Sequence, residues 1–453
     1  MRASTAEKTR PQPVAVLSDL VSRAKRKGAT AADAVLVDHQ SMSVSQRLGA
    51  RENLKRAEGR HIGLRAFVGK RQAMVSTSDV TPSTLDALLD RVVSMARAAP
   101  EDPYCGLAEP ELLAKHFPKL EMLDTYEPDG EALYQRAAEA ENAARAVKGV
   151  TNSDGASASW SRSENMLVTS DGFAGGYASS MYSTVASMIA GTGTAMETDY
   201  AMSRARFHDD LEAAATVGQE AGERSVKRLN PRKVESMSVP VIYEPRISNS
   251  ILGHFAGAIS GTSIARGTSF LRNDMGKKVF PDTVTIVDDP HRLRGLGSRP
   301  FDGEGVVTRA WALIEDGVLK TWMLSSASAR QLGLKTTGHA ARGIASPPGP
   351  SASNLYMEPG TLTPDELIAD IKLGVWLTDL IGFGVNMVTG DYSRGASGFL
   401  IENGKRAHPI SEFTIAGNLR TMFANVTPAN DLEFRYGTNA PTLRIDGMTV
   451  AGK

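Results

Sequence analysis

The sequence predicts an α+β protein, in which N-terminal α+β units precede a C-terminal, mostly antiparallel β domain with a buried helix. In the first half of the chain, segments with helical periodicity alternate with short segments of strand-like pattern. In the second half, two hairpins share near-identical turns, and one apolar helix precedes them. With 453 residues, of which 41% are hydrophobic, the chain is long enough for two or three domains with substantial cores.

The first unit is predicted to span residues 14–125, after a polar, disordered tail at residues 1–13. Apolar residues on one face predict helices at residues 14–25 and 84–98. Alternating patterns predict strands at 34–37 and 42–46, separated by a short polar turn, and a hairpin of residues 61–68 and 71–77. Residues 99–129 are rich in proline and acidic residues, which indicates a connector.

The second unit is predicted at residues 126–233. Its composition favours helices at 131–147 and 209–227, and strands at 157–161, 165–169 and 179–189. The strand serines are not in a Gly-x-Ser-x-Gly pattern, so we interpret them as surface residues rather than nucleophiles. The segment Asn230-Pro231-Arg232-Lys233 marks the boundary with the third domain, residues 234–453.

The third domain begins with a predicted strand at 237–243 that leads into a buried helix. Ser248 or Asn249 is the expected N-cap, and the helix is expected to end near Gly261. A further strand is predicted at 284–287. Hairpins at 310–322 and 398–408 turn through Asp316-Gly317 and Asn403-Gly404, pairs that favour type I′ turns. Thr363 is the expected N-cap of a helix with Pro364 at its first position.

Charge and cysteine content exclude several classes of protein. Lys plus Arg equals Asp plus Glu at 51 each, so the global charge gives no attraction to nucleic acid or anionic membranes. Cys105 is the single cysteine, which rules out an intramolecular disulfide and fits a reducing compartment. The N-terminus lacks an apolar signal region, and no stretch approaches the roughly 18–20 apolar residues of a membrane span. We therefore expect a cytoplasmic protein.

Several segments of the third domain together resemble one protein family. They are residues 246–272, Phe301-Asp302-Gly303-Glu304-Gly305 with its continuation to Arg309, residues 389–399, and Ile415-Ala416-Gly417-Asn418-Leu419. In sequence and order they resemble the TldD/PmbA family, and the similarity extends from about residue 30 to the C-terminus. The TldD branch resembles a zinc peptidase with a His-Glu-x-x-x-His helix, whereas the PmbA (TldE) branch lacks that motif and acts as its partner.

The resemblance assigns this chain to the PmbA branch. Counted back from Gly261 and Arg266-Gly267, the positions of His, Glu and His are occupied by Leu252, Gly253 and Gly257. Zinc needs imidazole, thiolate or carboxylate ligands, and a zinc peptidase also needs a base near the metal-bound water. We therefore expect no metal, no cofactor and no catalytic residue in this chain, with zinc in a TldD-type partner.

Five polar residues remain as candidates for a cleft or a partner contact: His254, Asp302, Glu304, Asp391 and Ser393. His254 is interpreted as a core histidine. Asp302 and Glu304, with the nearby Asp288-Asp289-Pro290-His291 segment, could form a weak cation site, although such residues are also usual in solvated turns. The segment 390–395, which contains Asp391 and Ser393, is either a structural turn or the wall of a groove where an extended peptide pairs with a strand edge.

The resulting functional hypothesis is a PmbA/TldE-like subunit of a cytoplasmic protease complex that processes or degrades unfolded peptides. By resemblance, the TldD-type partner performs the zinc chemistry, while this chain completes an enclosed chamber and helps to admit the peptide. One alternative is a self-sufficient metallopeptidase that uses His254 with Asp302 or Glu304. Another is a non-enzymatic regulator of DNA gyrase. A homodimer of the isolated chain also stays open, and neither nucleic acid nor membrane is expected as a partner.

Overall fold

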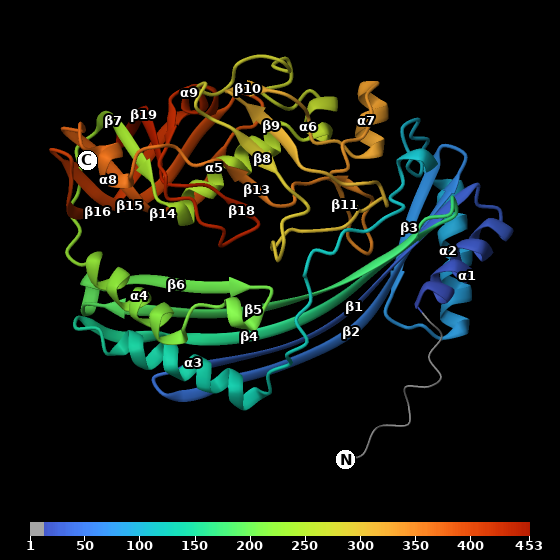
Figure 1. Ribbon diagram of the computed structural model, residues 1–453, viewed down its shortest axis with the longest axis horizontal. Coiled ribbons are helices and arrows are strands. Elements are labelled where there is room, and N and C mark those ends of the chain that lie inside the picture. The colour runs from blue at the N-terminus through green and yellow to red at the C-terminus, as the bar shows by residue number, and fades with distance from the viewer. Residues whose placement is uncertain (1–12) are drawn as a thin grey trace.

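The computed structural model describes residues 13–453 of the chain. The predicted disordered tail therefore lies, apart from Pro13, outside the described residues. Figure 1 shows a long curved sheet formed by the first half of the chain, with the second half of the chain placed over one of its faces.

The strands of the first half form a single antiparallel sheet of six strands, in the order β3-β2-β1-β4-β5-β6. They are β1 (Ala31–Arg47), β2 (Ala50–Val68), β3 (Arg71–Thr77), β4 (Val150–Thr169), β5 (Ala174–Ala190) and β6 (Glu197–Ala205). Because β1 pairs with both β2 and β4, strands from both sides of residue 125 belong to the same sheet. The division of this half into two units stays a prediction.

Two of these strands each join two segments that are predicted as separate strands. The strands predicted at 34–37 and 42–46 are one strand, β1, and those at 157–161 and 165–169 are one strand, β4. The polar residues that suggested a turn in β1 instead bond across the sheet. Arg60 Nε donates to Asp38 Oδ2 at 2.8 Å, and His39 Nδ1 lies 2.8 Å from Ser163 Oγ. These cross-strand partners let polar residues continue the strand, a pattern that propensity alone does not reveal.

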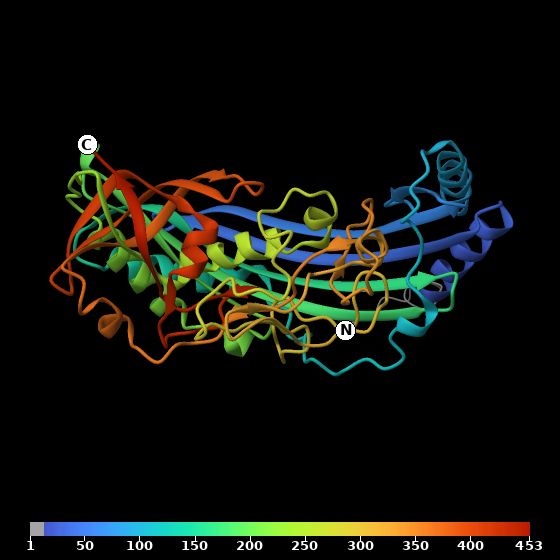
Figure 2. The same cartoon turned by 90° about the horizontal axis from the view of Figure 1, so that it is seen from above.

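Four helices cover one face of this sheet: α1 (Pro13–Arg26), α2 (Pro82–Ala98), α3 (Gly130–Arg145) and α4 (Ala214–Lys227). Ala34 and Leu36 pack with α1 and α2, whereas Val44 packs with α3. Even-numbered residues of β1 share a face, so all these contacts lie on the same side. The odd-numbered residues face the C-terminal domain. Figure 2 shows the long strands running beneath that domain. The helix predicted from Asp209 begins only at Ala214, because His208–Asp210 forms a separate 3₁₀ turn.

The C-terminal domain contains a β-barrel whose strands are mostly antiparallel, which confirms the predicted fold class. Its strands are β7 (Met237–Tyr243), β14 (Leu373–Val385), β15 (Asp391–Glu402), β16 (Lys405–Asn418), β17 (Val426–Pro428) and β19 (Leu443–Ala451). They lie in the order β16-β15-β14-β7-β19-β17, and an additional pairing of β16 with β19 closes the ring. Only the β7–β14 pair of this sheet is parallel.

Shorter elements complete the domain. A second sheet has the order β10-β9-β8-β13-β18, and β11 pairs with β12. These strands are β8 (Ile286–Asp288), β9 (Trp311–Glu315), β10 (Val318–Leu319), β11 (Ala340–Ala341), β12 (Gly349–Pro350), β13 (Leu355–Met357) and β18 (Thr438–Asn439). The remaining helices are α5 (Pro245–Ala258), α6 (Gly261–Ala265), α7 (Ser326–Leu332), α8 (Pro364–Ile368) and α9 (Leu419–Ala424).

Helix α5 is the predicted buried helix, but its first residues differ from the prediction. Its N-cap is Glu244 and Pro245 occupies the first turn, where a missing N–H costs nothing. The predicted cap Ser248 lies inside the helix, fully buried, and its hydroxyl donates to the Ala440 carbonyl at 3.1 Å. Five apolar residues of this segment are completely buried in the domain core: Ile251, Leu252, Phe255, Ala258 and Ile259.

The two predicted turns of this domain and its predicted cap at Thr363 are confirmed. Asp316 and Gly317 have φ values of 49° and 77°, and Asn403 and Gly404 have φ values of 49° and 75°. Both pairs thus have positive φ at the two central positions, as a type I′ turn requires. Thr363 caps α8 in a capping box with Glu366, whose backbone N–H donates to Thr363 Oγ1 at 3.2 Å.

Candidate functional site

The three positions that the family resemblance assigns to zinc ligands lie on α5, and their side chains offer no ligand to a metal. Leu252 is fully buried in the core and offers only hydrocarbon. Gly253 is exposed, and a Cβ added there would meet no atom within 4 Å. A Cβ added at Gly257 would touch only the Met387 methyl group, at 3.4 Å. The helix therefore has room for side chains at two of the three positions, but no lone pair at any of them.

His254 projects from the same helix into a half-buried environment without an acidic partner. Its ring meets the Tyr392 ring edge to face, with centroids 5.8 Å apart, and its Nε2 is buried with no hydrogen-bond partner. Burial, and then the nearby Arg394 guanidinium, lower the pKa of His254 to about 4. The imidazole is therefore neutral at pH 7. Among residues 13–453, no three His, Cys, Asp or Glu side chains lie close enough together to hold a metal ion.

Asp391 and Ser393 lie on β15, on the side opposite the intervening Tyr392. Asp391 Oδ2 accepts from Thr389 Oγ1 at 2.6 Å and its Oδ1 accepts from Asn418 Nδ2 at 3.2 Å. These bonds lower the pKa of Asp391 and fix the chain reversal between β14 and β15. Both edges of β15 are already paired, with β14 on one side and β16 on the other. β15 therefore offers no free edge of its own to an extended peptide, and a groove lined by residues 390–395 beside another strand edge stays a prediction.

Asp302 and Glu304 lie in a buried loop between the two halves of the molecule. Asp302 Oδ1 accepts backbone N–H groups of Glu304 and Val306, each at 2.9 Å, and its Oδ2 accepts the N–H of Ala340 at 3.1 Å. Glu304 Oε2 accepts the N–H of Ser326 at 2.8 Å. Both oxygens of Asp302 and one oxygen of Glu304 thus accept backbone donors, as structural carboxylates do. Burial together with Glu304 raises the pKa of Asp302 well above its usual range.

The acidic segment at residues 288–291 also has structural bonds. Asp288 accepts the backbone N–H and the hydroxyl of Ser353, both at 2.7 Å, and its Oδ2 lies 3.3 Å from His339 Nε2. His291 Nε2 lies 2.9 Å from Thr308 Oγ1. The structure therefore does not gather this segment with Asp302 and Glu304 into a cation site, and none of these residues shares a ligand cluster with His254.

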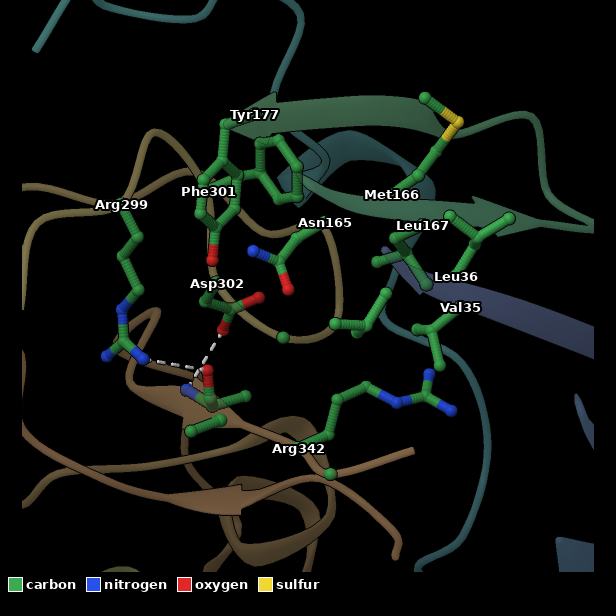
Figure 3. Close-up of a pocket in the computed structure, with 15 residues that line it drawn as sticks. Val35, Leu36, Asn165, Met166, Leu167, Tyr177, Arg299, Phe301, Asp302 and Arg342 are labelled. Atoms are coloured by element: carbon green, nitrogen blue, oxygen red, sulfur yellow. Dashed lines mark hydrogen bonds between the residues drawn. The ribbon is translucent and has the colours of Figure 1, made fainter. Parts of the chain in front are cut away.

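The loop of Asp302 helps to enclose a cavity of about 150 Å³ where the long sheet meets the C-terminal domain (Figure 3). The sheet contributes Val37, Asn165 and Tyr177, which are cross-strand neighbours on β1, β4 and β5. The C-terminal domain contributes residues 299–303 and 340–343. Phe301 packs edge to face against Tyr177, with ring centroids 5.6 Å apart. Residues of both halves of the chain thus meet at this junction.

A buried ion network, which no sequence pattern predicts, lies at the same junction. Arg65 Nε donates to Asp33 Oδ2 at 2.9 Å, and Arg342 Nη1 donates to Asp33 Oδ1 at 2.8 Å. All three side chains are no more than 4% exposed. Burial alone would raise the pKa of Asp33, but the Arg342 and Arg65 guanidiniums hold it below its usual value. Arg342 lies 309 residues from Asp33, so no local pattern connects them.

One further feature concerns membranes. Within the part of the chain that the structure describes, no helix combines the length and the apolar character needed to cross a bilayer.

Comparison with known proteins identifies the family. Three profiles of the PmbA/TldA metallopeptidases match the chain: domain 1 at residues 32–96, the central domain at 124–229 and the C-terminal domain at 236–452. The chain is 37% identical to Metalloprotease PmbA of Escherichia coli O157:H7, over 91% of this chain and 90% of that protein. It is also 37% identical to the PmbA homolog of Haemophilus influenzae, over 96% and 95% of the two chains.

Solved structures agree with these matches. A protein from Bacteroides thetaiotaomicron, described as a candidate modulator of DNA gyrase, is 27% identical and superposes with a TM-score of 0.89 over 97% of this chain and 98% of its own. TldE from Thermococcus kodakarensis has the same fold, with a TM-score of 0.86 at 19% identity over 96% of this chain and all of its own. A TldD homolog of Buchnera aphidicola is 26% identical over only 52% of either chain. The chain therefore belongs to the PmbA/TldD metallopeptidase family and, within it, to the branch of the proteins named PmbA.

Proposed function

We propose that this chain is the metal-free subunit of a TldD–TldE-type protease complex that processes or degrades unfolded peptides. The observation that carries the proposal is on α5. The chain keeps the fold of the peptidase domain, yet Leu252, Gly253 and Gly257 stand where a zinc-binding relative needs two imidazoles and a carboxylate. The zinc and the base that activates its water are then supplied by a TldD-type partner.

The cellular setting follows from the same proposal. A reducing compartment suits a chain whose single cysteine, Cys105, is buried and unpaired, and we therefore place the complex in the cytoplasm. Its substrates are unfolded peptides, since an unfolded chain can be threaded to a catalytic centre that a folded protein cannot reach. A homodimer of the isolated chain, in the absence of partner, is compatible with this role.

The self-sufficient peptidase has less support. Its ligand set requires His254 to share a metal with Asp302 or Glu304. The carboxylates of Asp302 and Glu304 accept backbone N–H groups, and His254 has Tyr392 and Arg394 as neighbours. The gyrase-modulator description of structural relatives belongs to those proteins, and no contact described above favours a gyrase-binding role for this chain.

The test combines metal analysis with a cleavage assay. The purified chain should contain no stoichiometric zinc, and unfolded casein should be cut only after a TldD-type chain is added. A TldD-type chain whose motif glutamate is replaced by glutamine serves as the control and should give no cleavage in the mixture. His254→Ala in the present chain should change neither the zinc content nor the activity of the mixture. Cleavage by this chain alone that a chelator abolishes would overturn the proposal.

A further inference from the structure

The cavity at the junction of the two halves contains arginine donors that no group in the described chain accepts. Arg342 uses only Nη1 on Asp33, whereas its Nε and Nη2 are buried without a hydrogen-bond partner. Its side chain is 4% exposed. Arg299 also lines the cavity. Its Nη1 and Nη2 donate hydrogen bonds to the carbonyls of Ala340 and Ser351, and its Nε has no partner.

The unused donors of Arg342 have a specific geometry. Nε and Nη2 form one edge of a guanidinium, from which two parallel N–H groups can bind the two oxygens of a carboxylate or phosphate. Arg65 uses this same edge on Asp33 Oδ2 in the same junction. Buried donors are almost always paired, so two unpaired N–H groups on one edge indicate a missing acceptor.

Charge and size point to the same class of ligand. Arg342 and Arg65 share the single carboxylate of Asp33, and Arg299 adds a third guanidinium beside the cavity. The negative charges that oppose these three guanidiniums are those of Asp33 and Glu304. Burial and Glu304 raise the pKa of Asp302, so Asp302 carries less negative charge near neutral pH than a free aspartate. A volume of about 150 Å³ is that of an engineered cavity able to hold benzene, so it suits a compact group and not a peptide chain.

We propose that this cavity binds a compact oxyanion, a carboxylate or phosphate group, on the free Nε/Nη2 edge of Arg342. Figure 3 shows the Arg342 guanidinium beside Val35 and, on the other side of the cavity, the Asn165 amide and the Tyr177 hydroxyl, which are further polar groups of the cavity lining. The exposed Gly343 lies on the rim of the cavity. Because Arg342 and Asn165 come from different halves of the chain, the bound anion would connect the long sheet to the C-terminal domain.

The experiment measures how much each of four probes raises the melting temperature of the full chain. The probes are inorganic phosphate, acetate, a short peptide with a free C-terminus and the same peptide with an amidated C-terminus. Chloride keeps the ionic strength constant throughout. At least one oxyanion should raise the melting temperature in a saturable manner. Phosphate alone would identify a phosphate site, acetate a free carboxylate, and a difference between the two peptides a chain terminus. No saturable shift with any of these probes would overturn the proposal.

Variants test the assigned donor. Arg342→Lys keeps a cation for Asp33 but removes the two-donor edge, and should weaken binding at least tenfold. Arg60→Lys is the matched control, because Arg60 pairs with Asp38 outside the cavity, and it should bind the anion as the wild type does. If Arg342→Lys does not fold, Asn165→Leu leaves the Asp33 network intact and should also weaken binding. Unchanged affinity in the folded cavity variants would refute the assignment.

Discussion

His254 gives a pH-dependent contribution to stability that can be worked out from its surroundings. Its imidazole is neutral in the folded protein because burial and Arg394 lower its pKa to about 4, from an ordinary value of 6.5. Tyr392, whose ring packs against His254, and Tyr243, whose hydroxyl bonds to that of Tyr392, have pKa values raised by burial and stay neutral in acid. The unfolded chain therefore binds a proton at this position at a higher pH than the folded protein does.

The sign and size of the effect follow from proton linkage. As the pH falls through about 6.5, the unfolded state takes up the proton first, so the free energy of unfolding decreases. The loss is complete below the folded pKa near 4. A shift of this size corresponds to at most about 3.5 kcal/mol, since each pKa unit is worth about 1.4 kcal/mol. For a domain of about 200 residues, a loss of this size lowers the melting temperature by roughly 7–14 °C.

The assay compares the wild type with His254→Gln, which keeps a polar side chain that does not titrate. Melting temperatures measured from pH 7 to pH 4 should fall more steeply for the wild type, and the difference should develop between pH 6.5 and 4. An NMR titration of the His254 ring, assigned by its absence in the variant, should show a midpoint near 4. Parallel melting curves, or an ordinary midpoint for this ring, would show that the burial argument is wrong. A chelator that destabilised only the wild type would instead indicate a metal on His254.

Three further predictions concern packing and local structure. Asp33→Asn should lower the free energy of unfolding by about 3–5 kcal/mol, because it leaves Arg65 and Arg342 buried without their counter-ion. Asp38→Asn, in the half-exposed pair with Arg60, should lower it by less than about 1 kcal/mol. Urea unfolding would measure both variants, and equal losses would contradict the role of burial. The Asp33 contribution is present above the ordinary aspartate pKa and is lost as the pH falls below it, since the folded pKa is lowered. Gly63→Ala should destabilise the protein by about 1–3 kcal/mol, because the new Cβ would lie 2.0 Å from the Ile344 carbonyl oxygen. Gly253→Ala, on a helix with open space around it, should stabilise the protein slightly. The melting temperatures of the two variants should therefore shift in opposite directions, and an unchanged melting temperature for Gly63→Ala would show that the loop containing Ile344 is not held against the sheet. Thr363→Ala should lower the free energy of unfolding by about 1 kcal/mol, because it removes the capping box. Thr363→Ser should retain most of that stabilisation. Identical urea midpoints for the two variants would argue against the cap.

Local patterns predicted those parts of the fold in which neighbouring residues decide the structure. Residues 237–243 form the predicted strand, and the Asp316-Gly317 and Asn403-Gly404 turns form as expected because positive φ is determined by the turn residues themselves. The buried face of α5 followed from its 3.6-residue period. Its first turn did not, because Ser248 looks like a cap but finds its hydrogen-bond partner at Ala440, far along the chain.

The strand lengths and the candidate site show where local patterns fail. The polar residues Asp38 and His39 predict a turn when only the sequence is considered. In the folded chain they instead pair across the sheet with Arg60 and Ser163. Likewise, residues 390–395 could themselves have formed a free strand edge, and only the pairing of β15 on both sides excludes this. Asp302 and Glu304 were selected from a family segment, but their backbone N–H donors and their place beside Arg342 became visible only in the folded chain.

By itself, the sequence determined the family resemblance and the absence of metal ligands at residues 252, 253 and 257, because the chemistry of a side chain is fixed by its identity. Only the tertiary structure decided that the two N-terminal segments share one sheet, and that Asp33 meets Arg342 across 309 residues of chain. Such long-range contacts arise from the packing of whole sheets and loops against one another. No short-range periodicity records them, so the buried arginine edge and its cavity could be recognised only after folding.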